Sequence, residues 1–372
     1  MSSTIVDGLS YPVIVSDDAA PDVAAAVEHG APVVVFADAR VRARARRIVG
    51  ALRARGARVL GSLFVRGGER GKSVRGAQSL WQDLLRLGAD RSTTLVAVGG
   101  GSITDLAGFA SATYMRGIAW IAVPTTVLGM ADAAIGGKTA IDLPQGKNLA
   151  GAFWPPRAVV ADLNALRTLA VRERATGIAE IIKAAIIADP GLLDLVERTD
   201  VAETDIAAWR ELIVRAARVK VGVVAADPQE RGVRAALNLG HTIGHAVEHV
   251  ARGALSHGAA VSVGLRGAGL LAVRLGMFAP SDHARILAAL RGAGLPLYWS
   301  PPGRGRRPLA KRDEDRVLQT LRRDKKRSGG SVQFVLPERI GEVRYAVAID
   351  VQLVRDAVRQ CAKPPQVEET ME

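Results

Sequence analysis

The chain has 372 residues, of which 48% are hydrophobic and 4% aromatic, and 39 are glycine. This composition excludes a largely disordered protein, and the length favours two domains. The formal net charge is +13, but the arginine-rich stretches at 41–58 and 304–316 lack interleaved aromatic residues and any zinc-finger or RNA-binding pattern. We therefore expect no nucleic-acid partner, and a polyanionic small substrate accounts for part of the excess charge.

The sequence also bears on where the protein works. Cys361 is the single cysteine, so no internal disulfide can form, and the N-terminal residues lack the pattern of a secretion signal. The longest apolar stretches, 117–137 and 258–277, are interrupted by proline or charged residues. We expect a cytoplasmic protein with no membrane partner.

Up to about residue 170, apolar runs of the strand type alternate with amphipathic helical runs. The strand-type runs are 11–15, 31–38, 57–65, 93–101 and 118–126. Such alternation is typical of a parallel sheet covered by helices. We predict an α/β domain with a parallel, helix-covered sheet over residues 1–170.

From about Val171 the pattern changes to long helical segments. These segments are 172–187, 205–225, 241–251, 258–277 and 283–294. Residues 331–338 and 341–349 then predict a short β pair, followed by a last helix that ends near Cys361. We predict that residues 171–372 form a mainly α-helical domain.

The first chemical motif is a strand-to-helix turn with three glycines, VAVGGGSITDLAGF. Glycines let the backbone approach a phosphate, and a helix beginning near Ile103 offers backbone N–H groups and the positive end of its dipole. The turn is not a GxGxxG fingerprint, so these residues alone leave a nucleotide site and a plain tight turn open. Asp105 follows the turn, where we expect a carboxylate to contact a ribose, an amide or a cation.

A cationic segment follows the last strand-type run. In RG and PTTVLGMADAAIGGKTAIDLPQGKN, the cations Arg116, Lys138 and Lys147 accompany Asp132 and Asn148. A solvated surface loop is one interpretation. We favour a phosphate-handling site, because surface loops seldom combine two Gly-Lys pairs, a Thr pair and an apolar setting.

The segment GIAEIIKAA places Glu180 and Lys183 three residues apart on one helical face. An ordinary surface ion pair is the alternative. The surrounding isoleucines make a solvated surface less favourable, and a carboxylate buried there requires a cation, such as a metal ion.

Four of the six histidines lie within seventeen positions, at His241, His245, His249 and His257. Histidine is the commonest metal ligand, so the clustering indicates a chemical site. The first three are spaced i, i+4, i+8 along one helical face. This spacing leaves a metal-binding pair and a polar surface stripe equally open.

These motifs occur together with KVGVVAADPQERGVRAALNLGHTIGHAVEH, LSHGAAVSVG and RRDKKRSGG. The set resembles 3-dehydroquinate synthase, of the sugar phosphate cyclase group, from about Asp38 to Arg327. The resemblance implies a Rossmann-like nucleotide-binding domain followed by a mainly helical metal- and substrate-binding domain. It also implies a carbon–oxygen lyase that converts 3-deoxy-D-arabino-heptulosonate 7-phosphate to 3-dehydroquinate and phosphate, in the shikimate pathway to chorismate and aromatic amino acids.

The resemblance implies a catalytic zinc or cobalt ion held by Glu180, His241 and His257. Three protein ligands leave coordination positions open for the substrate, as a catalytic site requires. His245 would then lie beside the substrate phosphate rather than bind the metal, and His249 would be structural or exposed.

The resemblance further implies NAD that is consumed and regenerated in each turnover. Positions that match the family's NAD contacts are Asp38, Glu69, Lys72, Gly100, Gly101, Asp105, Thr125, Thr126, Lys147 and Thr168. Positions that match its substrate pocket are Arg116, Asp132, Lys138, Asn148, Lys183, Lys220, Arg234, Asn238, His245 and Lys326. The arginine that matches Arg116 reaches into the partner subunit's site, which implies a homodimer.

The implied reaction is a transient oxidation by NAD, phosphate elimination, re-reduction and intramolecular aldol closure. Arg234 and Asn238 favour a carboxylated substrate over the sedoheptulose 7-phosphate of 2-epi-5-epi-valiolone synthases. An aminodehydroquinate synthase is the nearest alternative. A metal-dependent alcohol or glycerol dehydrogenase is the alternative from another class, and the lysine-rich pocket argues against it.

Overall fold

The computed structural model describes residues 2–301, 310–327 and 333–362, and for 322–327 it describes the backbone alone. The chain divides into two compact units. Unit 1 comprises Met1–Gly177 and Val201–Gln229, and unit 2 comprises Ile178–Asp200 and Glu230–Glu372. The predicted division after residue 170 assigns 201–229 to the second domain, whereas this segment packs with unit 1.

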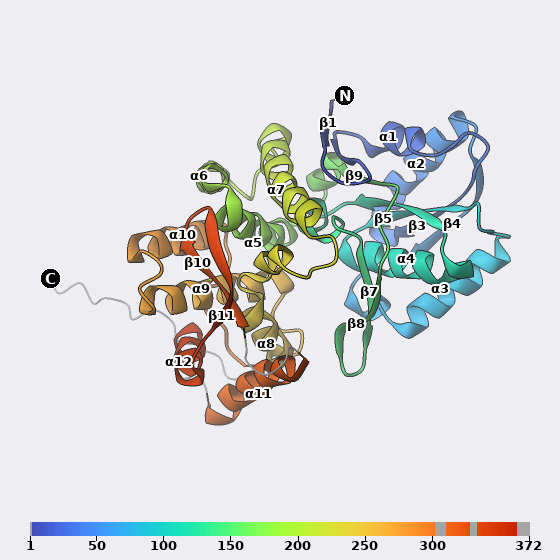
Figure 1. Cartoon of the computed structure of the whole chain (residues 1–372). Coiled ribbons are helices and arrows are strands. Elements are labelled where there is room, and N and C mark those ends of the chain that lie inside the picture. Colours follow the sequence, from blue (N-terminus) through green and yellow to red (C-terminus); the bar gives the residue numbers. More distant parts are fainter. Residues whose placement is uncertain (1, 302–309, 328–332, 363–372) are drawn as a thin grey trace. The chain divides into compact units, whose positions relative to one another are not determined.

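A seven-stranded sheet lies at the centre of unit 1, with the strand order β1-β2-β9-β6-β5-β3-β4 among the described residues (Figure 1). Its strands are β1 (Ser3–Val6), β2 (Val13–Ser16), β3 (Pro32–Asp38), β4 (Arg58–Val65), β5 (Thr94–Gly99), β6 (Ala119–Pro124) and β9 (Ala158–Asp162). β1 runs antiparallel to β2, and every other neighbouring pair is parallel. Each of the five predicted strand runs overlaps one of these strands, which confirms the parallel α/β sheet. The sequence analysis missed β1 and β9.

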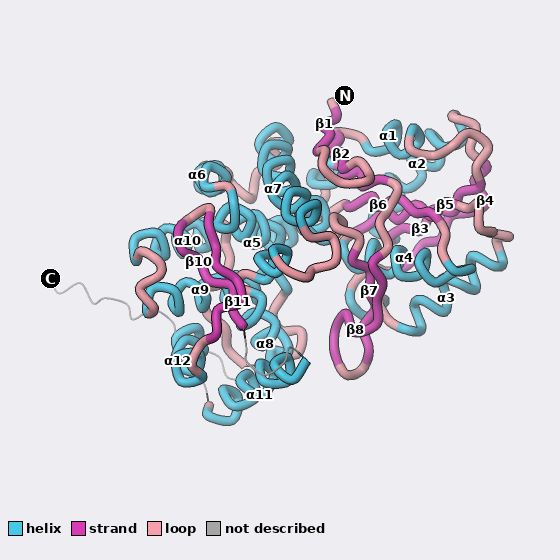
Figure 2. Tube along the Cα trace, viewed as in Figure 1, coloured by secondary structure: helices cyan, strands magenta, loops and turns pink. Residues whose placement is uncertain are grey.

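Helices cover both faces of this sheet (Figures 1 and 2). On one face lie α1 (Ala19–Ala25) and α2 (Arg42–Ala54), and on the other α3 (Val74–Arg86) and α4 (Gly101–Thr113). Alternate β3 side chains, Val33 and Val35, pack with Ile48 and Leu52 of α2 in one buried core. This period of two fixes the strand register. The turn from β5 into α4 therefore lies at the carboxyl edge of the sheet, where ligands bind in such folds.

The cationic segment after β6 is not an irregular loop. It contains a short π-helix, η4 (Gly129–Ala133), and an antiparallel hairpin of β7 (Lys138–Leu143) and β8 (Gly146–Phe153), which Figure 2 shows as two paired strands. Thr139 and Ile141 point inward and are buried. The surface-loop interpretation is therefore wrong, because alternate side chains of β7 are buried.

Two further helices contribute to unit 1. Helix α7 (Ile206–Ala226) begins at Asp205, whose carboxylate accepts hydrogen bonds from the backbone N–H of Ala207 and Ala208. Helix α5 (Val171–Ala188) begins in unit 1 and continues into unit 2. At Gly177 an added Cβ would lie 2.4 Å from Cβ of Val127, so only glycine permits this close packing.

Unit 2 is mainly helical. Besides the second part of α5 it contains α6 (Pro190–Arg198), the 3₁₀ segment η6 (Val233–Asn238), α8 (His241–Ala251), α9 (His257–Arg274), α10 (Pro280–Gly292), α11 (Lys311–Arg327), α12 (Val351–Cys361) and the antiparallel pair β10 (Gln333–Arg339) and β11 (Glu342–Ala348). The predicted helical character and the predicted β pair are both found. Buried Glu314 of α11 forms ion pairs with Arg355 and Arg359 of α12.

Helices α8 and α9 approach each other unusually closely. An added Cβ at Gly264 of α9 would lie 1.8 Å from the carbonyl oxygen of Gly240, and one at Gly244 would lie 2.8 Å from that of Ala260. Gly240 also has a φ of +75°, a region that favours glycine. The glycines thus bring the first turns of α8 and α9 together, and each of these turns begins with a histidine.

Among the described residues, the helices are all too short or too polar to span a bilayer.

Candidate functional site

Three side chains of unit 2 converge on one point. The Glu180 carboxylate of α5 lies 3.5 Å from Nε2 of His241 on α8 and 3.2 Å from Nε2 of His257 on α9, in both cases through Oε1. One donor atom from each residue lies within 4.8 Å of the other two. The structure thus brings together the three residues predicted as metal ligands.

The donor set and its spacing fit a divalent metal ion. One carboxylate oxygen and two imidazole nitrogens form a common ligand set of catalytic zinc, and ligands about 2.0–2.2 Å from a tetrahedral ion lie roughly 3.3–3.6 Å apart. The two distances from Glu180 are close to this spacing. Glu180 is also fully buried within an apolar helix face, where an ionised carboxylate requires cationic partners.

Lys183 supplies one such partner at 2.5 Å, through the other Glu180 oxygen, and its side chain is also buried. The predicted i, i+3 pair is therefore a buried one, and the surface ion pair interpretation is wrong. Burial raises the pKa of Glu180, but the charge of Lys183 and the two histidines outweigh it and hold the pKa well below its usual range. The carboxylate is ionised and ready to bind a cation at neutral pH.

The two histidines differ in protonation. Burial lowers the pKa of His241 to about 3, with the Lys183 charge adding to this effect against the attraction of Glu180. Burial also opposes the charged form of His257, but its contacts with Glu180 and Glu248 raise the pKa to about 10. His241 is thus a neutral nitrogen donor, while His257 carries a proton that a bound metal ion would displace.

A second donor group shares His257. His245 and Glu248 of α8 offer ligand atoms within 4.8 Å of each other and of His257. The ring centroid of His245 lies 4.9 Å from that of His241 and 5.9 Å from that of His257. His245 is exposed, whereas Glu248 is almost buried. Glu248 was missed by the sequence analysis, although it lies two helical turns after His241 and so on the same face.

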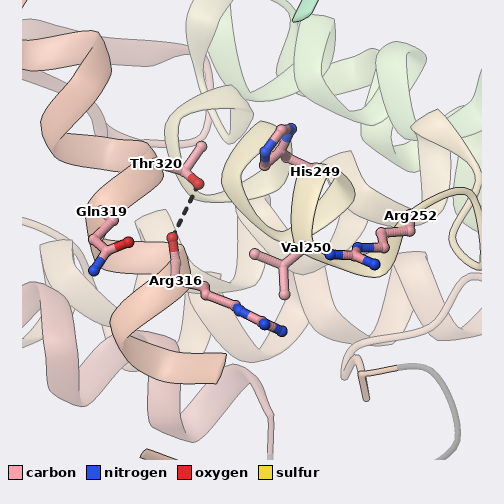
Figure 3. Close-up of a pocket in the computed structure, with 6 residues that line it drawn as sticks. All are labelled: His249, Val250, Arg252, Arg316, Gln319 and Thr320. Carbon is pink, nitrogen blue, oxygen red and sulfur yellow. Dashed lines mark hydrogen bonds between the residues drawn. The ribbon is translucent and has the colours of Figure 1, made fainter. Parts of the chain in front are cut away.

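His249 faces a different part of unit 2. It lines a cavity of about 290 Å³ together with Val250 and Arg252, and with Arg316, Gln319 and Thr320 of α11 (Figure 3). In Figure 3 the Thr320 hydroxyl points to the carbonyl of Arg316, to which it donates at 2.9 Å. Among the described residues, neither donor group includes His249. The third histidine of the i, i+4, i+8 series is therefore separate from the residues that could hold a metal ion.

The remaining predicted residues of unit 2 lie on η6 and α11. Arg234 is 1% exposed, and Asn238 is exposed, with its amide donating to Glu230 at 3.4 Å. Glu230 was also missed by the sequence analysis. Lys326 lies on α11, but its side chain is outside the described residues.

In unit 1 the glycine turn forms the N-terminus of α4. The helix begins at Gly101, earlier than the predicted start near Ile103, and Gly100 is its N-cap. An added Cβ at Gly100 would lie 3.1 Å from Cγ2 of Thr126. Thr126 and buried Thr125 follow β6, so the two predicted threonines lie at the same edge as the turn. The arrangement offers backbone N–H groups without side-chain obstruction, as a nucleotide phosphate requires.

Lys72 is the centre of a buried charge cluster beside this turn. It follows η2 (Glu69–Gly71), its Nζ lies 2.5 Å from Oδ2 of Asp105, and it also donates to Oδ1 of Asn148 on the hairpin. Burial raises the pKa of Asp105, and this effect exceeds the lowering by the charge of Lys72. Burial likewise raises the pKa of Glu69 against Lys72 and Lys147. Asp105 therefore contacts a cation, one of the three partners expected for it.

Asp38 ends β3 and is buried. Its carboxylate accepts hydrogen bonds from the backbone N–H of Arg40 at 2.9 Å and from the Arg40 guanidinium. Burial raises its pKa, but these bonds outweigh it and the pKa is lowered. The side chain is an acceptor at the end of the second predicted strand, as a ribose contact requires.

The other predicted residues of unit 1 fall into two groups. Asp132 in η4 holds Lys220 of α7, with Nζ 2.6 Å from Oδ1. Arg116 in η3 (Tyr114–Arg116) is exposed with a φ of +69°, Lys138 is exposed at the start of β7, and Thr168 caps η5 (Leu163–Arg167). The structure thus pairs Asp132 with Lys220 and gives Arg116 a strained backbone and a solvent-facing side chain.

Two family models match consecutive parts of the chain. Residues 62–176 match 3-dehydroquinate synthase N-terminal, and residues 177–327 match 3-dehydroquinate synthase C-terminal. The chain is 44% identical over 297 residues to 3-dehydroquinate synthase of Pseudarthrobacter chlorophenolicus, an alignment that covers 79% of each chain.

Solved structures share the fold. 2-Epi-5-epi-valiolone synthase from Streptomyces hygroscopicus subsp. jinggangensis, with NAD+ and Zn2+ bound, has a TM-score of 0.83 at 24% identity over 97% of this chain and 99% of that one. 2-Deoxy-scyllo-inosose synthase, complexed with carbaglucose-6-phosphate, NAD+ and Co2+, has a TM-score of 0.83 at 24% identity over 97% of this chain and 100% of that one. These likenesses confirm the α/β unit followed by a helical one.

Proposed function

The chain belongs to the 3-dehydroquinate synthase family and has its lyase activity on a sugar phosphate, and on this premise we propose the cofactors, site residues and assembly that it uses. The substrate is 3-deoxy-D-arabino-heptulosonate 7-phosphate, and the products are 3-dehydroquinate and phosphate. The observation that supports this proposal best is the donor group in which half-buried His241 and His257 meet the buried carboxylate of Glu180.

The proposed cofactors are NAD and a zinc or cobalt ion. Bound NAD would accept and return a hydride, and the divalent ion would supply Lewis-acid chemistry. Glu180, His241 and His257 would hold the ion, since their donor type and spacing fit it. The relatives of known structure that carry NAD+ with Zn2+ or Co2+ support the pair of cofactors.

Residues at and near the glycine turn would hold NAD. Gly100 and Gly101 leave the N-terminus of α4 open to a pyrophosphate, and the Asp38 carboxylate is placed to accept from a ribose hydroxyl. The full proposed set is Asp38, Glu69, Lys72, Gly100, Gly101, Asp105, Thr125, Thr126, Lys147 and Thr168.

Cationic and amide side chains would bind the two anionic groups of the substrate. Lys183 and Arg234 are buried, and a charged hydrogen bond from a buried cation to an anionic group of the substrate is stronger than one in water. Asp132 orients Lys220 through a 2.6 Å contact. The full proposed set is Arg116, Asp132, Lys138, Asn148, Lys183, Lys220, Arg234, Asn238, His245 and Lys326.

These cations also define what the protein does during phosphate elimination. The substrate's own phosphate is the proposed base for the neighbouring C–H, so the side chains fix the phosphate oxygens near that proton rather than remove it themselves. His245, which is exposed beside His241 and His257, would contact the phosphate.

We also propose a homodimer in which Arg116 serves the partner subunit's site. Its exposure and its φ of +69° are consistent with a side chain held outward for another molecule. Light scattering should give twice the mass of the 39.2 kDa chain. Arg116→Ala subunits, mixed with subunits inactivated at Glu180, should show partial activity only if subunits exchange and the site is shared.

The substrate is tested by phosphate release with NAD well below the substrate concentration and added Zn2+. We expect release from the heptulosonate phosphate and little from sedoheptulose 7-phosphate. A preference for the amino analogue would assign an aminodehydroquinate synthase. Net NADH formation from a polyol without phosphate release would instead assign an alcohol dehydrogenase.

A further inference from the structure

Both nitrogens of the His257 ring face a carboxylate of unit 2. Nε2 lies 3.2 Å from Oε1 of Glu180, and Nδ1 lies 3.6 Å from Oε2 of Glu248. Glu248 is 9% exposed, so the packing around α8 restricts the position of its carboxylate. The first carboxylate belongs to the proposed metal ligand set, and the second lies outside it.

A histidine that binds a cation through one nitrogen carries its proton on the other. A carboxylate that accepts this proton fixes the tautomer and the ring orientation, and it makes the coordinating nitrogen more basic. In His257 the nitrogen that faces Glu180 is Nε2, so the proton belongs on Nδ1, where Glu248 lies.

The close contact of α8 and α9 explains why Glu248 lies there. Gly244 and Gly264 remove the side chains that would separate the two helices. Glu248 follows His241 by two helical turns, and the first turn of α9 places His257 opposite this face. The same packing therefore positions both the proposed ligand His257 and the carboxylate of Glu248.

We propose that Glu248 is a positioning residue for the metal ligand His257, which it holds through Nδ1. The proposal rests on the proposed metal function of Glu180, His241 and His257. It differs from a role of Glu248 as a metal ligand, which the second donor group of His245, Glu248 and His257 would permit. Glu180 is the more deeply buried carboxylate and has His241 beside it, so the ion belongs on the Nε2 side.

The test measures zinc affinity in the full-length chain after its metal has been removed, by competition with a chromophoric chelator. Four proteins are compared: wild type, Glu248→Gln, Glu248→Ala and His249→Gln. The last is a matched control, because His249 is the next residue on α8 and lies outside both donor groups. Glu248→Gln keeps the shape and an oxygen acceptor, so it guards against loss of folding in the alanine variant.

We expect one zinc per wild-type chain. Zinc should bind about 10–100-fold more weakly to Glu248→Ala, less weakly to Glu248→Gln, and unchanged to His249→Gln. Saturating zinc should restore most of the kcat of Glu248→Gln, which a fault in folding would not allow.

Three results would overturn the proposal. Wild-type affinity in both Glu248 variants would exclude positioning. Two zinc ions in the wild type and one in Glu248→Gln would make Glu248 a ligand. Failure of the wild type to bind zinc would reject the metal function itself. Glu180→Gln, included as a fifth protein, separates this failure from the first, because it loses zinc that the wild type binds if the metal function holds.

Discussion

Two charge clusters among the described residues, one in each unit, are built in opposite ways. In unit 1 a lysine lies among acceptors. Lys72 contacts Asp105 and Asn148, and its charge opposes the rise that burial causes in the pKa of Glu69. In unit 2 a carboxylate lies among nitrogen atoms: Glu180 contacts Lys183, His241 and His257. One cluster is centred on a cation of the protein, and the other on an anion.

This difference indicates what each cluster can bind. The Lys72 cluster pairs its lysine with oxygen acceptors and contains no imidazole, so it can organise the glycine turn without a metal ion. The Glu180 cluster contains two imidazoles whose neutral forms are metal donors, and its single carboxylate is shared among three nitrogen-bearing side chains. It is complementary to a small divalent cation. The comparison predicts that metal removal affects unit 2 alone.

The largest expected effect is that of Glu180→Gln. The substitution keeps the shape but removes the buried negative charge that both His241 and His257 contact, so we expect phosphate release to fall by roughly 10³-fold or more. Stoichiometric zinc binding, measured by elemental analysis after dialysis, should also be lost. The control Glu211→Gln alters an exposed carboxylate of α7 and should change neither quantity; a similar loss there would remove the significance of Glu180.

His257→Ala should have the next largest effect. It removes one of the proposed ligands, and metal-dependent turnover should be abolished at ordinary zinc concentrations. His249→Ala removes a histidine that lines a separate cavity and should leave turnover close to wild type. Equal losses in the two variants would mean that the histidine cluster has been divided wrongly.

Lys72→Met should affect the other cluster. The lysine is 3% exposed, so its loss leaves Asp105 without its cation. We expect a destabilisation of about 3 kcal/mol in urea unfolding and weaker NAD binding, with zinc content unchanged. Lys72→Met combined with Asp105→Asn should recover part of the stability. Loss of zinc in the single variant would contradict the separation of the two clusters.

The smallest expected effect concerns a buried thiol that belongs to neither charge cluster. Burial raises the pKa of the Cys361 thiol from 9.0 to about 12. The folded state therefore keeps the proton where the unfolded state loses it, so this stability is complete below pH 9 and is lost as the pH rises toward 12. The free energy of unfolding should fall by at most about 1.4 kcal/mol per pH unit in that range. Cys361→Ala should remove this slope, and an unchanged slope would assign it to other groups.

The sequence predicted β2, β3, β4, β5 and β6, each of which lies in a largely apolar run. Runs such as Val33–Phe36 are apolar throughout, so their pattern is strong. The missed strand β1 has four residues, of which two are polar, and β9 follows two prolines. The β7–β8 hairpin is rich in glycine and charge, and its pairing depends on the cover that α4 provides.

The candidate site was less predictable from spacing than from the family resemblance. The i, i+4 spacing leaves a metal pair of His241 with His245 open, whereas the structure places His241 with Glu180 and His257, which come from other helices. Their convergence depends on the contact of Gly244 and Gly264 between α8 and α9. A contact of this kind has no local periodicity, and it also explains why Glu248 was missed.

The central claim is that the cluster of Glu180, His241 and His257 holds the metal ion on which phosphate release depends. The most direct test is to remove metal from the full-length protein with a chelator and return Zn2+ in steps, while phosphate release from the heptulosonate phosphate is followed with catalytic NAD. We predict that activity is lost on removal and rises linearly to a plateau at one zinc per chain, and that Glu180→Gln shows no such rise. Full activity in the metal-free protein, or the same titration in Glu180→Gln, would contradict the claim.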